Sequence, residues 1–181
     1  MQKIEDANWE FARRLLQCVA VAFRPLRVEE LAEILAFDFQ AGPIPKFHED
    51  WRVEEPREAV LSTCSTLLAL GTDGFSPVIH FSHFSVKEFM TSSHLAERSD
   101  AVFRRYHISM TSAHTLITQA SLGILLHLDK NITKSSQVAN FPLADYAAQH
   151  WFKHTRFEGV SQNVEEGMKQ LFDPGKHHIA V

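Results

Sequence analysis

The sequence predicts a mainly α-helical protein that carries one small β-hairpin. Three observations favour this fold class. Apolar residues recur at helical spacing through most of the chain. The 181 residues include only 7 Gly and 7 Pro, which is few for a many-turned β protein. One Asp-Gly pair, Asp73-Gly74, stands between two short apolar runs, as the turn of a hairpin does.

The first half of the chain alternates helices with short connections. Arg24-Pro25 ends the first helix, because the residue before a proline avoids helical geometry, and Pro25-Leu26-Arg27 is predicted as a short extended link. In the second helix, Glu29, Glu30 and Glu33 are predicted to face solvent. In chain order, the predicted elements are helices at 8–23 and 28–37, an ordered loop over 38–56 pinned by Phe47 and Trp51, a helix at 57–66, a hairpin with its turn at 71–74, and a helix from Ser85 to about His94.

Helix, link, helix, loop, helix and hairpin is the order of a winged helix, with the hairpin as the wing. We therefore predict a winged-helix domain over 8–95. Residues 96–175 form an all-helical segment by pattern, and 176–181 form a tail. The helices predicted in the second half cover 102–110, 112–128, a segment opened by Phe141-Pro142, and 161–172.

Charge and composition exclude several function classes. The net charge is −4, and residues 1–95 hold 9 Lys+Arg against 14 Asp+Glu, so no general basic field recruits nucleic acid. Cys18 and Cys64 lie in apolar helical patterns and are predicted as buried free thiols in a reducing compartment. No apolar run approaches the ~20 residues of a membrane span, and Met1 to Glu10 resembles no leader peptide. We therefore predict a cytoplasmic chain without a membrane partner.

The sequence lacks the usual signatures of catalysis and metal binding. His150 and His154 are four residues apart and share a predicted helix face, as zinc-ligand pairs do, but the Glu of a metalloprotease helix is missing between them. Neither the Gly-Lys-Ser/Thr phosphate loop nor the Gly-x-Ser-x-Gly nucleophile turn occurs. We therefore predict a chain that is not an enzyme, with no catalytic residue, no metal site and no cofactor bound by the chain alone.

The segment from Phe81 to Met90 joins the end of the hairpin to a helix. Ser85 and Glu88 have the spacing of a capping box, and the segment's phenylalanines are predicted to be apolar anchors. His83 stands beside the helix N-terminus, where backbone N–H groups and the helix dipole attract anions such as phosphate. Two interpretations of His83 stay open at this point: a phosphate contact, or a residue that only caps or packs the corner.

DNA binding is the main alternative function, since winged helices often read the major groove. The predicted recognition helix, Arg57 to Thr66, holds one Arg and no Lys, and Glu54, Glu55 and Glu58 surround its start. Affinity for DNA depends on neutralising phosphates with cations, so this acidic helix argues against DNA binding.

A family resemblance extends over nearly the whole chain. The strings that carry it are Leu16–Ala20, Arg24–Glu33, Ala36–Phe39, Val60–Ser65, the segment from Phe81, Tyr106–Ile108, Ala113-His114 and Phe141 through Trp151. Together they resemble the winged-helix region after the NACHT ATPase core of fungal STAND NTPases, many of which carry ankyrin repeats. This winged helix is also named after a GPI inositol-deacylase.

The resemblance implies a non-catalytic regulatory and interaction module of a NACHT/STAND-type signalling NTPase. Its partners are then a NACHT NTPase core and ankyrin repeats, which this sequence lacks, so we expect a fragment or a standalone remnant. His83 is similar to a histidine that reaches the bound diphosphate in related proteins, which implies a nucleotide-phosphate contact only when an NTPase core is present. Partner contacts are expected from exposed apolar side chains, with Phe47, Trp51, Phe152 and Phe157 as candidates.

Overall fold

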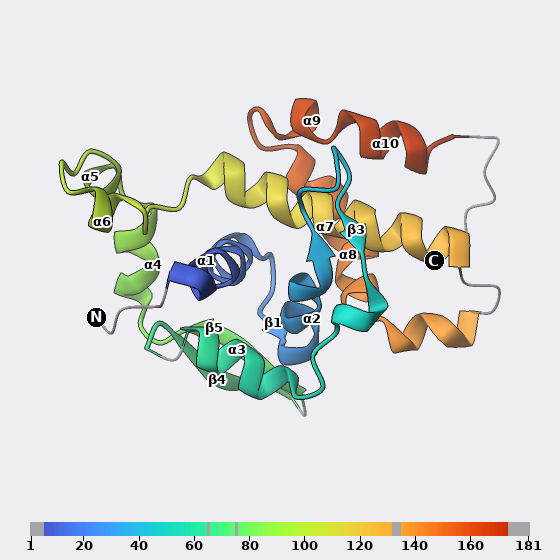
Figure 1. Ribbon diagram of the computed structural model, residues 1–181, viewed down its shortest axis with the longest axis horizontal. Coiled ribbons are helices and arrows are strands. Elements are labelled where there is room, and N and C mark those ends of the chain that lie inside the picture. Colours follow the sequence, from blue (N-terminus) through green and yellow to red (C-terminus); the bar gives the residue numbers. More distant parts are fainter. Residues whose placement is uncertain (1–5, 65, 75, 132–134, 174–181) are drawn as a thin grey trace.

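The computed structural model describes residues 6–64, 66–74, 76–131 and 135–173. Helices dominate these residues, which confirms the predicted fold class. Figure 1 shows the long helix α7 (Met110–Asn131) crossing the molecule and a β-hairpin at the bottom of the view. Helix α1 (Asp6–Val21) contacts both of them and therefore lies at the centre of the fold.

The first half folds as a winged helix. The short link predicted around Leu26 is a strand, which pairs antiparallel with the second strand of the hairpin through Leu26↔Ile79 and Arg27↔Val78. In the resulting sheet, the second strand of the hairpin therefore lies between this link strand and the first strand of the hairpin. The hairpin turn includes Gly74, the last residue of the predicted turn over 71–74, whose φ of +62° favours glycine, while residues 71–73 belong to the first strand of the hairpin. After α1, the elements of the winged helix are β1 (Leu26–Arg27), α2 (Val28–Glu33), α3 (Pro56–Cys64), β4 (Leu68–Asp73) and β5 (Ser76–Phe81).

The predicted loop over 38–56 contains regular structure. The predicted helix at 28–37 ends early, since α2 stops at Glu33 and a short 3-10 turn, η1 (Ile34–Ala36), follows. Phe37 then pairs with Phe47, and their rings lie 5.1 Å apart. Gly123 of α7 permits the close packing of this segment, because a Cβ there would lie 2.9 Å from both the Phe37 ring and the Pro45 carbonyl oxygen. The elements are β2 (Phe37–Asp38), β3 (Lys46–Phe47) and the 3-10 turn η2 (Glu49–Trp51).

The second half is helical, as predicted, but its boundaries differ. The helix predicted at 102–110 ends at Arg104, and the helix predicted at 161–172 is divided at Val164, which has φ −121° and ψ 10°. Residues 176–181, the predicted tail, lie outside the described residues. Besides α7, the elements are α4 (Phe84–Thr91), α5 (Ser93–Ala96), α6 (Ala101–Arg104), the 3-10 helix η3 (Ser135–Asn140), α8 (Leu143–Thr155), α9 (Val160–Asn163) and α10 (Glu165–Leu171).

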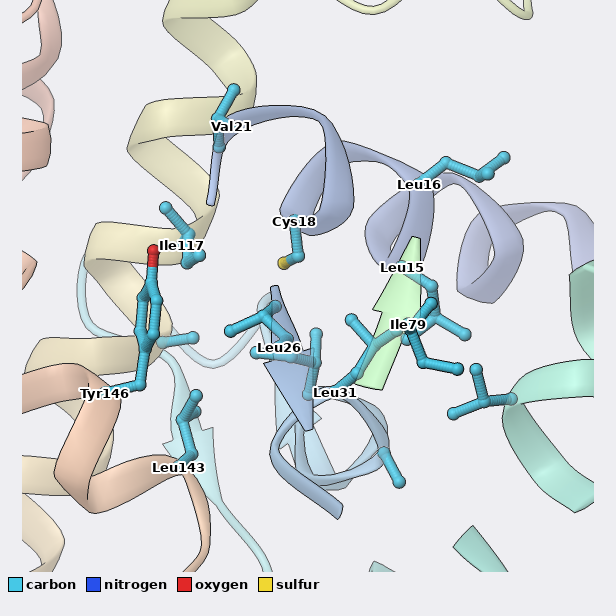
Figure 2. Close-up of a cluster of buried hydrophobic side chains, with 14 of the residues drawn as sticks. Leu15, Leu16, Cys18, Val21, Leu26, Leu31, Ile79, Ile117, Leu143 and Tyr146 are labelled. Atoms are coloured by element: carbon cyan, nitrogen blue, oxygen red, sulfur yellow. The ribbon is translucent and has the colours of Figure 1, made fainter. Parts of the chain in front are cut away.

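One hydrophobic core joins the winged helix to the helical segment. Figure 2 shows Leu15 of α1 and Ile79 of β5 in the same cluster as Ile117 of α7 and Tyr146 of α8. Cys18 faces this cluster, and Cys18 and Cys64 are both buried and free, as predicted. Burial raises the pKa of the Cys64 thiol to about 12, so this thiol is an unreactive core residue.

Two glutamates that were predicted to face solvent are buried instead. Arg24 holds the Glu30 carboxylate with two hydrogen bonds of 2.7 Å, and the Arg27 backbone N–H donates a third of 2.8 Å. Burial alone raises the pKa of Glu30, but these hydrogen bonds outweigh it and the pKa lies below its ordinary value. The prediction was wrong because helical periodicity does not reveal the arginines that fold back onto α2.

Glu33, one turn later on α2, connects the two halves of the chain. It pairs with Arg52, and its other carboxylate oxygen accepts a hydrogen bond of 2.7 Å from the Leu143 backbone N–H. That N–H belongs to the first turn of α8, where helical N–H groups lack partners within the helix. Burial raises the pKa of Glu33, since the bonds from Leu143 and Arg52 do not fully offset the loss of water.

A chain of hydrogen bonds runs through the interior between α1, α7 and α8. The Phe23 N–H donates to the Tyr146 hydroxyl at 3.1 Å, and this hydroxyl lies 2.9 Å from His154 Nε2. His154 Nδ1 lies 2.7 Å from His114 Nδ1. The hydroxyl, which accepts from Phe23, and the two imidazoles thus form one connected hydrogen-bond network. We call Arg24, Glu30, Glu33, Arg52, His114, Tyr146 and His154 the polar seam.

Candidate docking site at the start of helix α4

His83 caps helix α4 through its side chain. Its backbone is extended (φ −149°, ψ 147°), and Nδ1 accepts hydrogen bonds from the Ser85 backbone N–H at 3.3 Å and from the Ser85 hydroxyl at 2.7 Å. The predicted capping box of Ser85 and Glu88 is therefore wrong, since the helix begins one residue earlier with His83 as its N-cap. The structure thus shows that His83 caps the corner, while its contact with phosphate stays a prediction.

The capping bonds also fix the tautomer of the exposed imidazole. Because a backbone N–H can only donate, Nδ1 carries no proton and Nε2 carries it in the neutral ring. Among the described residues, His83 Nε2 has no hydrogen-bond partner. His83 therefore has one N–H donor available at the surface, beside the N–H groups of the first turn of α4.

A groove of about 690 Å³ lies next to this helix start, a volume within the range of ligand pockets. The end of α1, the β1 link, β5 and α4 form its walls. The Phe84 side chain is 69% exposed and that of Phe23 is 45% exposed. Lys87 and Glu88 of α4 add one charge of each sign to the lining. The groove can thus hold apolar side chains of a partner next to polar groups.

The exposed aromatic residues are not all those that the sequence suggested. Trp51, Phe152 and Phe157 are exposed as predicted, whereas Phe47 is only 5% exposed and belongs to the core. Phe47 is buried because β3 places it between Phe37 and His127 of α7, at 5.1 and 5.0 Å. Trp51, predicted to pin the same loop, lies at the surface.

The structure also exposes aromatic residues that sequence reasoning placed inside. Phe84 was predicted to be an apolar anchor but faces solvent on the first turn of α4. Phe23 is the last residue of the helix predicted over 8–23, but α1 ends at Val21 and Phe23 lies outside it. Pro25 was the available signal, since the residue before a proline avoids helical geometry and the helix has to end ahead of it.

The histidines do not form a metal site in the described part of the chain, where no group of three or more His, Cys, Asp or Glu side chains could hold an ion. His154 turns inward to His114 instead of pairing with His150. The ring of His150 lies 4.7 Å from that of Tyr146. The i, i+4 spacing of His150 and His154 thus reflects two different packing roles.

The helix order and the β1-β5-β4 sheet define this molecule as a winged-helix protein. More specifically, the chain belongs to the family described as GPI inositol-deacylase, winged helix domain, because that family's model matches residues 3–102. The chain is also similar to the azaphilone pigments biosynthesis cluster protein L of Monascus ruber, with 29% identity over 167 residues.

That alignment covers 88% of this chain and 34% of the Monascus protein, so the chain spans about a third of the length of this relative. No solved structure matches the chain. Among the described residues, none of the helices combines the length and apolarity needed to cross a bilayer.

Proposed function

We propose that this chain is a non-catalytic regulatory and interaction module of a NACHT/STAND-type NTPase, and that it docks on the NTPase core with the face around His83 and Phe84. The exposed Phe84 beside an open groove is the observation that carries the proposal. A large aromatic ring left in solvent at a groove is typical of a protein contact site. Ankyrin repeats complete the proposed assembly, as the resemblance of the sequence implies.

In this proposal His83 contacts the phosphates of a nucleotide bound by the core. Two features of the site support this role. The neutral ring presents its Nε2–H outward, and the N-terminus of α4 favours an anion at the same place. Capping and phosphate contact are compatible, because they use different nitrogens of the ring. The buried thiols of Cys18 and Cys64 suit a cytoplasmic place of action.

The test is calorimetric titration of the full chain with a purified fungal NACHT core loaded with ADP. We expect binding that Phe84→Ser weakens by about tenfold or more, since a central aromatic contact is worth 2 kcal/mol or more. His83→Asn retains a good N-cap but removes the imidazole, and is expected to lower the preference for the ADP-loaded core. The matched control is Glu97→Gln at the exposed α5–α6 link.

Equal affinity of the Phe84→Ser variant and the unchanged chain would contradict the docking face. Nucleotide hydrolysis by the purified chain alone would contradict its non-catalytic role. The alternative function, DNA binding, meets repulsion from Glu55 and Glu58, both exposed on or beside α3. A gel shift at low salt tests it, and we expect no retarded duplex.

A further inference from the structure

A second apolar groove, of about 680 Å³, lies on a different face of the winged helix. It is formed by α1, α3 and the segment between α2 and α3, and it shares no lining residue with the groove beside α4. The apolar part of its lining includes Phe11, Leu35, Trp51, Val53 and Ala59. Two of these rings reach solvent, Phe11 at 42% and Trp51 at 49% exposure.

Neighbouring side chains support the shape of this second groove. The Trp51 ring is stacked on His48 with the ring centres 4.2 Å apart. On the α1 side, the Arg14 guanidinium lies over the Phe39 ring at 4.8 Å and is paired with Glu10 at 3.3 Å. A partner therefore meets rings that are already positioned, which lowers the entropy lost on binding.

The rim of this groove is acidic. Segment 49–58, which supplies Trp51 and Val53 to the lining, contains the exposed carboxylates Asp50, Glu54, Glu55 and Glu58, while Glu49 pairs with His127 of α7 at 3.0 Å. Of its two arginines, Arg52 is turned inward to Glu33 and to the Asn140 carbonyl, which leaves Arg57 as the cation of this rim segment. Glu55, just before α3, and Glu58 of α3 precede the lining residues Ala59 and Ser62 by four, so they lie on the side of the helix that faces the groove.

We propose that this groove binds a basic amphipathic helix of a partner protein. Apolar residues at i, i+3 or i+4, and i+7 would enter between Phe11 and Trp51, as in other helix-in-groove complexes. Lysines or arginines on the flanks would face the carboxylates of segment 49–58. The charge selects this occupant, because the same rim repels nucleic acid and acidic segments. The inference concerns a surface separate from the one proposed to meet the NTPase core.

The test uses the full chain and a fluorescein-labelled 18-residue model helix with leucines on one face and lysines on the other. Its matched control peptide replaces every lysine with glutamate. By fluorescence anisotropy we expect the lysine peptide to bind at least about tenfold more tightly than the glutamate peptide, with the difference reduced by salt. Trp51→Ala is expected to weaken binding of the lysine peptide by about tenfold.

Charge reversal gives the sharper comparison. The variant Glu54→Lys/Glu55→Lys/Glu58→Lys should reverse the preference between the two peptides. A control variant with the same change in net charge, Glu97→Lys/Glu158→Lys/Glu165→Lys, alters exposed residues away from the groove and should bind like the unchanged chain. Circular dichroism verifies that each variant is folded.

Several results would overturn the inference. If the two triple variants weaken binding of the lysine peptide equally, the net charge of the chain governs binding and the groove is not the binding site. Loss of binding in Phe84→Ser but not in Trp51→Ala would place the peptide in the other groove. Self-association of the chain that Trp51→Ala abolishes, seen by sedimentation, would show that the occupant is a second copy of the chain.

Discussion

The polar seam and the two grooves differ in which kind of side chain they bury and which they expose. The seam buries carboxylates and imidazoles, while the grooves expose phenylalanine and tryptophan rings, which are usually inside. Each buried carboxylate of the seam has several partners, so the seam fixes how α8 meets α2. The exposed aromatic rings of the grooves are not enclosed by neighbouring side chains in this way. The difference teaches that the seam serves the fold, whereas the grooves are the surfaces that we propose for contact with partners.

The largest expected effect comes from a cavity in the shared core. Ile117 of α7 is fully buried against α1, and Ile117→Ala should lower the free energy of unfolding by about 2–5 kcal/mol. If the two halves form one cooperative unit, amide protection falls in α1 and β5 as well as in α7 and α8. Hydrogen exchange with mass spectrometry measures this. If amide protection falls only in α7 and α8, the two halves unfold separately.

The seam can be tested with two adjacent glutamates of α2. Glu30→Gln removes a buried carboxylate that holds Arg24 and Arg27. We expect the free energy of unfolding to fall by about 3 kcal/mol. Glu29→Gln is the matched control, because Glu29 is exposed and the unfolding midpoint should not move. Urea denaturation followed by circular dichroism compares them. Similar midpoints for both variants would refute the structural role of the buried network.

The histidines of the seam should make stability depend on pH. Burial lowers the pKa of His114 to about 4 and that of His154 to about 3, below the ordinary value of 6.5. Between pH 6.5 and 4 the unfolded chain therefore binds more protons than the folded chain, so stability falls as pH falls. Each histidine contributes a slope approaching about 1.4 kcal/mol per pH unit.

Thermal unfolding at a series of pH values measures this slope. His114→Gln is expected to reduce it, because one buried imidazole no longer takes up a proton on unfolding. Replacement of an exposed histidine, His94→Gln, serves as the control. If the slope of the His114→Gln variant matches that of the unchanged chain, the pair does not control the pH dependence.

Local patterns predicted the helices and the hairpin, but not the side chains that link distant segments. The order of a winged helix follows from signals such as Pro25 and Asp73-Gly74, which act within a few residues. Glu33 receives a bond from Leu143, and His114 meets His154, across separations of 110 and 40 residues. A single sequence carries no periodic signal for such pairs. His83 was placed at the right corner, yet its capping role depended on where α4 begins.

The smallest effect on stability is expected at the docking face. Phe84→Ser removes a ring that is 69% exposed, so the free energy of unfolding should change by no more than about 0.5 kcal/mol. Binding of a dye that fluoresces on apolar surfaces should fall in the same variant, because the ring provides such a surface beside the groove. Urea denaturation and dye titration test the two expectations on one sample. A loss of stability comparable to that of Glu30→Gln would place Phe84 among the residues that hold the fold, and the distinction between seam and groove would fail at this position.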